Sequence, residues 1–490
     1  MDDQSSATHQ HHGASEELQS LEEAFSSDDY TTSVVPLTKR RSNLRMFLTF
    51  VSLQATFPTL FAGYVARSQG LSLGQLMLAM GIASATMIVY CIGAANLGAV
   101  TGQTHTLITR TIFGRWGSGL VSLLMIIVGV GFYTFQATFV TSQLDGLFTI
   151  GSATLVAFIF CIVMMTNTLF GFKGVAGFAS FVAAPLALVW VTYAFIKILL
   201  SHPGHHLLAP PTVAPTATVL IVTGLVVGAN TWGNEPDLFR YSKLRPQFNI
   251  PTVVAGYVIG AFLFPVTGYL YAVVSGTTDF GASTRFFANS TLFGLTWLAT
   301  LFFFVQAFAG NDGNLYLSTN ASQNLIGGLR RWRRPFTVLI LGGTAAVLSL
   351  FFNNLSKDFF IVAGISAVTI PSATTIMVMD YFVLPKLTKQ IRPTNTVTPW
   401  HRTGQANWPA IIALVAATVV GGVTGGLIPG LPGFGKAIHW YPALQAWIVG
   451  AVVYLVLGTL AARRANYKTL LGYPLEETER AEDEAALQAG

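Results

Sequence analysis

Long apolar stretches, separated by short charged or Pro/Gly-rich segments, run through this chain from about residue 46 to residue 462. Only 10% of its 490 residues are charged, whereas soluble proteins carry about 25%. So few charges cannot cover the surface of a globular protein of this size, and the remaining solution is a surface that faces lipid. The sequence therefore predicts an all-α polytopic membrane protein.

Twelve transmembrane helices are predicted, because an apolar helix of about 20 residues crosses the hydrocarbon core. Both ends of the chain then lie on the same side of the membrane. The expected spans are residues 46–66, 74–96, 117–142, 152–172, 175–200, 216–236, 250–275, 292–318, 336–353, 359–384, 408–430 and 443–462.

The basic residues predict which side is cytoplasmic. With both termini inside, the inner segments hold all but five of the 27 Lys and Arg residues, as the positive-inside rule requires. One missed or spurious span would destroy this separation. The net charge of +6 is thus a topology signal and needs no nucleic-acid partner. The five basic residues left outside are Arg67, Lys197, Arg285, Lys357 and Lys436.

The two ends of the chain differ from the apolar part in composition. Residues 1–35 are polar, acidic and rich in Ser, which predicts a disordered cytoplasmic tail, and residues 463–490 form a second cytoplasmic tail. Cys91 and Cys161 lie inside apolar runs, so we expect neither a disulfide nor a metal site. The cytoplasmic membrane is the expected location.

The first span contains a helix breaker. Pro58 lies in its middle, flanked by Gln54, Thr56 and Thr59. Proline removes one backbone hydrogen bond and clashes with the preceding turn. Two interpretations remain open, a Pro kink packed against a neighbouring helix and an unwound span whose carbonyls face a cavity.

The end of the sixth span, from Gly228 to Tyr241, is a poor helix former that contains two glycines, two asparagines and a proline. Asp237 and Arg240 are expected to form an interfacial ion pair or a gate. Asn230 and Trp232 lie deeper, where an unsatisfied polar group is costly and indicates a cavity or a ligand.

Spans eight and three carry further polar groups at membrane depth. An Asp in the Asn-rich stretch of span eight, Asp312, is expensive in lipid unless it lines water or binds a solute. In span three, Phe132 and Gln136 are four residues apart and share one helix face. A ring and an amide on one face suit a planar heterocycle, although aromatic residues also pack at helix interfaces.

These features recur at matching places in the chain. The broken spans, one and six, begin two consecutive sets of five, and spans three and eight are third in each set. Inverted repeats of this kind place a midplane binding site at discontinuous helices.

Several of these segments resemble one known family, the nucleobase:cation symporters, which include cytosine permeases, hydantoin permeases and purine–cytosine permeases. The resemblance runs through most of residues 36–462. It rests on Val35–Leu37 with Arg40–Ser42, Gly70–Ser72, Phe113–Gly114, Phe170–Gly174 through Pro185, Pro236–Tyr241, Asn311–Tyr316, Ala367–Pro371 and Asp380–Phe382.

The resemblance implies a leucine-transporter-type fold with a 5+5 inverted repeat plus two C-terminal helices. Residues 36–200 would form the first repeat, residues 201–384 the second, and residues 385–462 the last two spans. The substrate would lie between aromatic rings of spans three and six and bond to amides. The implied substrate-binding residues are Phe132, Gln136, Asn230, Trp232, Gln306, Asn311 and Asn314.

One departure from the family concerns the coupling ion. Sodium-coupled members place two hydroxyl residues before the span-eight asparagine, where this chain has Ala309 and Gly310. Carbonyls near Phe57 and Leu60 would remain as a poor sodium site. We therefore expect proton coupling rather than sodium coupling, with no other cofactor. The carboxylates available for it, which the sequence does not rank, are Glu235, Asp237 and Asp312.

A second departure concerns the substrate. Cytosine permeases pair a glutamine and a tryptophan where this chain has Gly129 and Phe132, and the glutamine is instead Gln136. A purine, a pyrimidine, an allantoin- or hydantoin-like compound or a vitamin-like heterocycle stays open. The expected function is secondary active import of such a solute. The alternatives are a non-transporting receptor and a sodium-coupled transporter of another small solute; no motif of a membrane enzyme is present.

Overall fold

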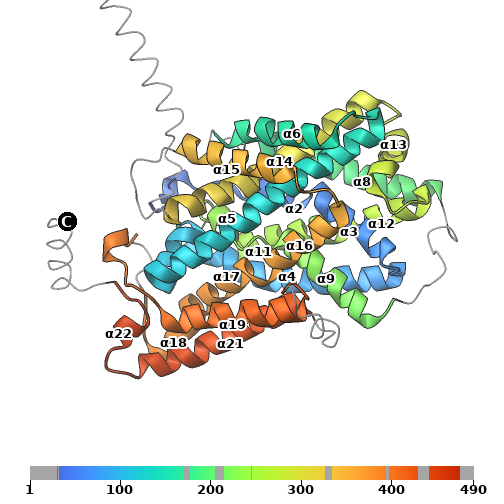
Figure 1. The fold of residues 1–490 in the computed structure, drawn as a ribbon. Helices are drawn as coiled ribbons and strands as arrows, with labels where there is room; N and C mark the ends of the chain where they lie inside the picture. The colour runs from blue at the N-terminus through green and yellow to red at the C-terminus, as the bar shows by residue number, and fades with distance from the viewer. Residues whose placement is uncertain are drawn as a thin grey trace, which may run out of the picture.

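The computed structural model describes residues 30, 33–169, 177–202, 204, 214–243, 246–325, 334–392, 397–428 and 441–474. Apart from one isolated β-bridge between Asn407 and Leu471, these residues form helices and their connections. Most long helices run along one common direction in a single bundle (Figure 1). The basic segment 330–333, the link 170–174 and most of both predicted tails lie outside the described residues.

The first five predicted spans are helical. The third is part of a longer helix, α5, and the fifth begins with a π-helical turn at Ala179–Ala183. The elements are α2 (Asn43–Gln54), α3 (Phe57–Ser68), α4 (Leu73–Thr101), α5 (His105–Phe148), α6 (Ala153–Thr168) and α8 (Ala184–Ser201).

The second set of five contains two interrupted spans and an additional helix, α13, which meets α14 at a 114° bend at one end of the bundle. Its elements are α9 (Thr216–Asn230), α10 (Glu235–Phe239), α11 (Pro246–Tyr257), α12 (Phe264–Ser275), α13 (Phe280–Thr291), α14 (Thr296–Leu325), α15 (Arg334–Ser349), α16 (Leu355–Val368), α17 (Ile370–Val378) and α18 (Leu384–Thr388).

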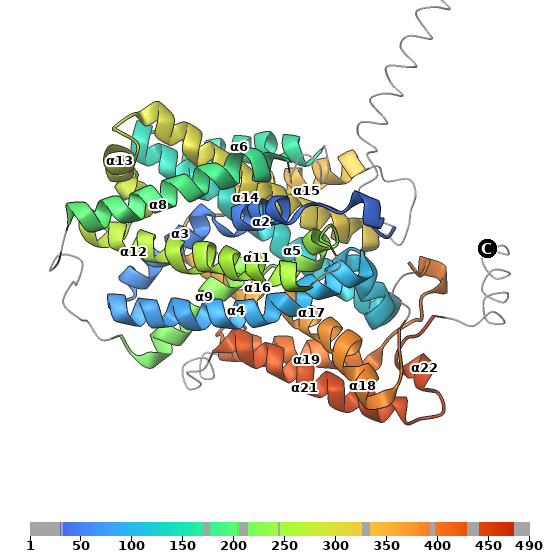
Figure 2. The same ribbon diagram turned by 180° about the vertical axis from the view of Figure 1, so that it is seen from behind.

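The last two predicted spans correspond to α19 (Trp408–Thr424) and α21 (Pro442–Ala462), which pack side by side on one flank of the bundle, beside α17 and α18 (Figure 2). A short helix, α22 (Tyr467–Leu470), follows. Within the described residues, eight helices are long and apolar enough to cross a membrane, and the bent pair adds a ninth. Three shorter apolar helices fall on the other predicted spans, so the count of twelve stays a prediction.

The break in the first span lies just before Pro58. Helix α2 ends at Gln54, and α3 starts at Phe57 with Pro58 in its first turn. A first-turn proline costs little, because the N–H that it lacks would have no intrahelical partner there. The span is therefore discontinuous at Ala55 and Thr56, and Pro58 starts the second half instead of kinking a continuous helix.

Helix α5 has a sharp bend at Gly114. Its φ of 73° and ψ of −177° separate the first turns of the helix, from His105 to Phe113, from the long part that crosses the bundle. Only glycine adopts this backbone conformation freely. A Cβ here would also lie 2.9 Å from the backbone of Ala406, so the bend is held against the segment before α19.

Close backbone contacts fix both broken spans to their neighbours. A Cβ on Gly63 of α3 would overlap the carbonyl oxygen of Pro265 in α12, and a Cβ on Gly268 would overlap that of Leu60. In the second repeat, Gly228 of α9 lies in the same way against the carbonyl of Ala363 in α16. Small residues are what allow such close helix approach in membranes.

An ion pair holds the chain between α18 and α19 against the bundle. The guanidinium of Arg392 donates to both carboxylate oxygens of Asp380, at 2.9 and 3.0 Å, and to the carbonyls of Thr111 and Leu471. Burial alone would lower the pKa of Arg392, but the Asp380 carboxylate raises it above its usual range. The pair therefore joins the start of α5 to the C-terminal segment.

Replacing Gly63 with Ala should destabilise the protein by about 1–3 kcal/mol, because the added methyl group forces α3 away from α12. The control is Gly81→Ala in α4, where a Cβ meets nothing within 4 Å and stability should be unchanged or slightly higher. The thermal unfolding midpoint of the purified protein measures both. Equal midpoints for the two variants would contradict this packing.

Candidate functional site

The break in the sixth span is supported by hydroxyl groups of the tenth. Helix α9 ends at Asn230 and α10 begins at Glu235, so the residues between them leave their carbonyls without helical partners. Ser366 donates to the carbonyl of Thr231 at 3.3 Å, and Thr374 donates to that of Gly233 at 2.7 Å. The tenth span is itself interrupted between α16 and α17, which brings both hydroxyls to the break.

Polar groups near the break in the first span differ in whether they have hydrogen-bond partners. The hydroxyl of Thr59 donates to the carbonyl of Thr56 at 2.6 Å and closes the turn. Both amide atoms of Gln54 and the hydroxyl of Ser52 are buried without hydrogen-bond partners. Gln54 is fully buried and is absent from the residues predicted to bind substrate. Its position beside Pro58 was the signal that could have found it.

Three of the predicted binding amides also have an atom without a partner. In Gln136 of α5 it is Nε2, and this amide lies against Gly310 of α14. In Asn230 it is Oδ1, whereas Nδ2 donates to Val226 of the same helix at 2.8 Å. In Gln306 it is Oε1, whereas Nε2 donates to the carbonyl of Ala183 at 3.2 Å.

The two predicted asparagines of span eight are engaged with protein groups. The amide nitrogen of Asn311 donates to the carbonyl of Tyr133 at 3.2 Å and contacts the sulfur of Met164 at 3.0 Å. Its oxygen accepts from Asn314 at 3.3 Å. In this structure Asn311 therefore joins α14 to α5 and α6. Its role in binding substrate stays a prediction.

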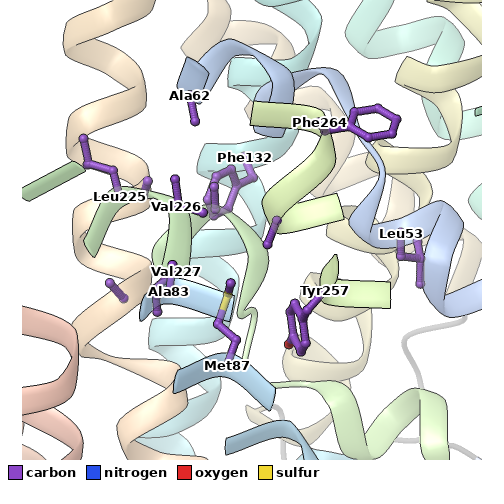
Figure 3. Packing of buried hydrophobic residues seen from close by; sticks show 14 of the residues in the cluster. Leu53, Ala62, Ala83, Met87, Phe132, Leu225, Val226, Val227, Tyr257 and Phe264 are labelled. Atoms are coloured by element: carbon purple, nitrogen blue, oxygen red, sulfur yellow. The ribbon is translucent and has the colours of Figure 1, made fainter. Parts of the chain in front are cut away.

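The two predicted aromatic residues differ in exposure. Phe132 is buried in the central hydrophobic core, together with Leu225 and Val226 of α9 (Figure 3). Trp232 is partly exposed in the broken segment, and its indole N–H donates to the carbonyl of Ala229 at 3.1 Å. Of the two rings, Trp232 is thus the one that is not fully buried.

A layer of phenylalanine rings lies about one helical turn from Gln136. Phe139, three residues along α5, stacks on Phe280 with centroids 4.8 Å apart. Phe61 of the first span is 5.6 Å from Phe359 of the tenth. With Phe135, these rings join α3, α5, α13 and α16 into one aromatic layer. None of these phenylalanine residues was predicted to be functional; the sequence shows them only as part of apolar runs.

A vestibule of about 580 Å³ opens beyond this layer, at the end of the bundle that carries α13. Phe61 and Phe280 line its inner part, and its walls hold hydroxyl, amide and carboxylate groups. Its volume lies in the range of roughly 300–1,000 Å³ that small-molecule sites occupy. The wall residues from α5, from α16 and from the residue before α16 include Thr138, Thr141, Ser142, Asp145, Asn354, Ser356 and Asp358.

A much smaller cavity, of about 30 Å³, lies at the break of the sixth span. Phe50 and Leu53 of α2, Gly313 and Tyr316 of α14, and the segment from Trp232 to Leu238 line it. This volume holds water but not a heterocycle. The centre of the protein is therefore closed in this conformation, with the vestibule on one side and this cavity on the other.

Asp237 and Arg240 lie at the end of the bundle opposite to the vestibule. The carboxylate of Asp237 accepts the backbone N–H of His105 and the amide of Asn320. Arg240 donates to the hydroxyl of Tyr316 at 2.9 Å and to the carbonyl of Tyr30. Both residues are fully buried. Their expected role as an interfacial ion pair or a gate stays a prediction.

The remaining coupling candidates are dispersed. The carbonyl of Leu60 packs against Gly268, and the side chain of Phe57 lies outside the described part. Asp312 accepts from Thr168 of α6 at 3.4 Å, and Glu235 faces the small cavity. In the described residues, no three His, Cys, Asp or Glu side chains are placed to hold a metal ion.

Two interrupted helices that meet at a closed centre, with a vestibule at one end, define a multi-pass membrane transporter rather than an enzyme. The family of permeases for cytosine/purines, uracil, thiamine and allantoin matches residues 34–421, and the chain belongs to this family. The cytosine permease of Escherichia coli (strain K12) is 23% identical over 451 residues, which cover 90% of this chain and 96% of the permease.

Solved structures confirm the leucine-transporter-type fold. Mhp1, a nucleobase-cation-symport-1 family transporter seen in a closed conformation with bromovinylhydantoin bound, has a TM-score of 0.67 and 15% identity, covering 93% of this chain and 98% of that chain. A Na⁺-coupled sialic acid symporter has a TM-score of 0.61 and 10% identity, covering 90% of this chain and 91% of the other.

Replacing Thr374 with Val removes the donor to the Gly233 carbonyl and keeps the shape of the side chain. The buried carbonyl then loses its partner, so we expect a loss of about 1–3 kcal/mol in stability. Thr374→Ser retains the hydroxyl and should lose less. Thermal unfolding of the purified variants measures this, and a Val variant as stable as the Ser variant would show that the break does not need the hydroxyl.

Proposed function

We propose that this protein imports a planar nucleobase-like heterocycle by alternating access across the cytoplasmic membrane, coupled to protons. The substrate would be a purine, a pyrimidine or an allantoin- or hydantoin-like compound. Membership of the permease family and the hydantoin bound to Mhp1 support this class of substrate.

The observation that carries the proposal is the set of buried amide atoms without partners on spans one, three, six and eight. An amide buried without a hydrogen bond costs about 1–3 kcal/mol. Within the described residues, four amides on four different spans each have a buried atom without a partner: Gln54, Gln136, Asn230 and Gln306. They offer both N–H donors and carbonyl acceptors, which is the pattern that the edge of a nucleobase-like ring requires.

Aromatic rings supply the second requirement of a flat solute. Stacking on a ring is worth about 0.5–1.5 kcal/mol beyond the burial of area. Trp232 is partly exposed at the break, and Phe132 lies on the same face of α5 as Gln136. When the centre opens, a heterocycle could occupy the space between these rings with its edge toward the amides.

The distribution of charge supports an outward-facing vestibule. Arg67, Arg285 and Lys357, which are among the few basic residues on the predicted outer side, belong to the end of the bundle that carries the vestibule. The gate at Asp237 and Arg240 then faces the cytoplasm. Uptake would require the phenylalanine layer to open first and this inner gate to open after it.

Radiolabelled cytosine, uracil, adenine, hypoxanthine, allantoin and hydantoin, offered singly to proteoliposomes that contain the purified protein, test the function. At least one should be taken up faster than into protein-free liposomes and should exchange with the unlabelled compound. Binding of a heterocycle without uptake would identify a receptor instead. Neither binding nor uptake would contradict the proposed class of substrate.

Replacing Gln136 with Leu should reduce the affinity for the transported heterocycle about 10- to 100-fold, since one buried hydrogen bond is lost. The protein itself should be at least as stable, because an unpaired buried amide is removed. The control is Gln143→Leu, two turns along α5, which removes another buried amide without partners. Equal loss of affinity in both variants would place the site elsewhere; equilibrium binding and thermal unfolding measure the two effects.

A further inference from the structure

Glu235 is a buried carboxylic acid at the centre of the protein, and its environment differs from that of the other buried acids. It is the first residue of α10, lines the small cavity and is only 2% exposed. Its Oε2 accepts a hydrogen bond from the hydroxyl of Tyr90 in α4 at 2.9 Å, and its Oε1 has no partner.

No cation pairs with Glu235 among the residues that the structure describes. The titratable groups that face it are Tyr90 and Cys91 of α4 and Tyr257 of α11. The backbone N–H groups of Glu235 itself, Trp232 and Gly233 lie near its carboxylate and partly offset its negative charge, but none of them makes a hydrogen bond to Oε1. Arg240, one turn further along, donates instead to the Asp237 carbonyl, to Tyr316 and to Tyr30.

The other buried acids already have structural partners. Asp380 pairs with Arg392 and accepts from Tyr454. Asp237 accepts from His105 and Asn320, and Asp312 accepts from Thr168 of α6. An ionised carboxylate is costly in an apolar interior unless it is paired and hydrogen-bonded. Glu235 is the acid for which that cost is least offset.

We propose that Glu235 is the proton-carrying group of the transport cycle, protonated while the centre is closed and ionised when the inner gate opens. This inference rests on the proposed function, since it assigns the coupling site of that transporter. Its place also supports the role, because the cavity that it lines is bounded by Trp232, Asp237 and Tyr316, where the expected substrate site meets the gate.

The proton transfer has two steps. A hydronium ion that enters from the vestibule side gives a proton to Oε1 of Glu235 and becomes water, and the new O–H bond makes the side chain neutral. After the inner gate opens, cytoplasmic water takes the same proton and the carboxylate is restored. Because the closed state buries Glu235 as a neutral acid, the centre closes around the substrate only after Glu235 has taken up a proton. Substrate and proton therefore cross together.

The experiment compares wild-type protein with Glu235→Gln, which keeps the shape of the protonated side chain but cannot release a proton. Proteoliposomes with clamped membrane potential receive an inward proton gradient and the heterocycle that the uptake panel identifies. Wild type should accumulate it up to about tenfold per pH unit for one proton per substrate. The Gln variant should exchange labelled for unlabelled substrate yet accumulate none.

Infrared difference spectroscopy provides a readout that does not depend on transport. Wild-type protein at neutral pH should show the C=O stretch of a protonated carboxyl group, and Glu235→Gln should lack it. Tyr90→Phe should shift this band but retain it, because the hydroxyl bonded to Oε2 is gone while the acid remains.

Accumulation by the Gln variant under a proton gradient, or a wild-type spectrum unchanged by the substitution, overturns the assignment. Accumulation driven by sodium alone also overturns it. A wild-type protein that shows the Glu235 band but transports none of the six heterocycles would contradict the proposed function and not the protonation of Glu235. The two failures are therefore distinguishable.

Discussion

Backbone and amide groups that cannot reach water must find partners inside the protein, and this requirement shapes the centre of the structure. Spans one and six are both discontinuous, but the polar groups at the two breaks differ in whether they are hydrogen-bonded. At the sixth span, Ser366 and Thr374 satisfy the carbonyls of the broken segment, so the break is a stable part of the fold. Around the first span, the polar atoms of Ser52 and Gln54 stay unpaired. The fold thus fixes one break firmly and leaves the adjoining polar surface available to a solute.

Packing explains how such a centre can be closed on both sides without being rigid. Phenylalanine rings from four elements separate the vestibule from Gln136, and these rings make no directional bonds that would prevent their rearrangement. On the other side, Asp237 and Arg240 form hydrogen bonds to α5, α14 and Tyr30. The proposed alternating access would require the apolar closure toward the vestibule and the polar closure opposite to it to open in turn.

Much of this architecture follows from the sequence because its signals are local. Apolar run length gave the spans, and Pro58 with the Gly- and Asn-rich end of span six marked the two breaks. The long-range partners could not be found in this way. Tyr90 lies in a uniformly apolar run, and only the fold brings it to Glu235, 145 residues away. Likewise, nothing local indicates that Asn311 bonds to Tyr133 and Met164, or that Phe61, Phe139, Phe280 and Phe359 meet. Side chains without partners are visible only once the neighbours are placed, which is why Gln54 escaped prediction.

The central claim is that a flat heterocycle supplies the hydrogen bonds that these buried amides lack. A high-resolution structure of the protein with a transported heterocycle tests it most directly. We expect the ring beside Trp232, with its polar edge within hydrogen-bonding distance of Nε2 of Gln136 and Oδ1 of Asn230. Density for the heterocycle elsewhere, with those two amides bonded to neighbouring helices, would contradict the account.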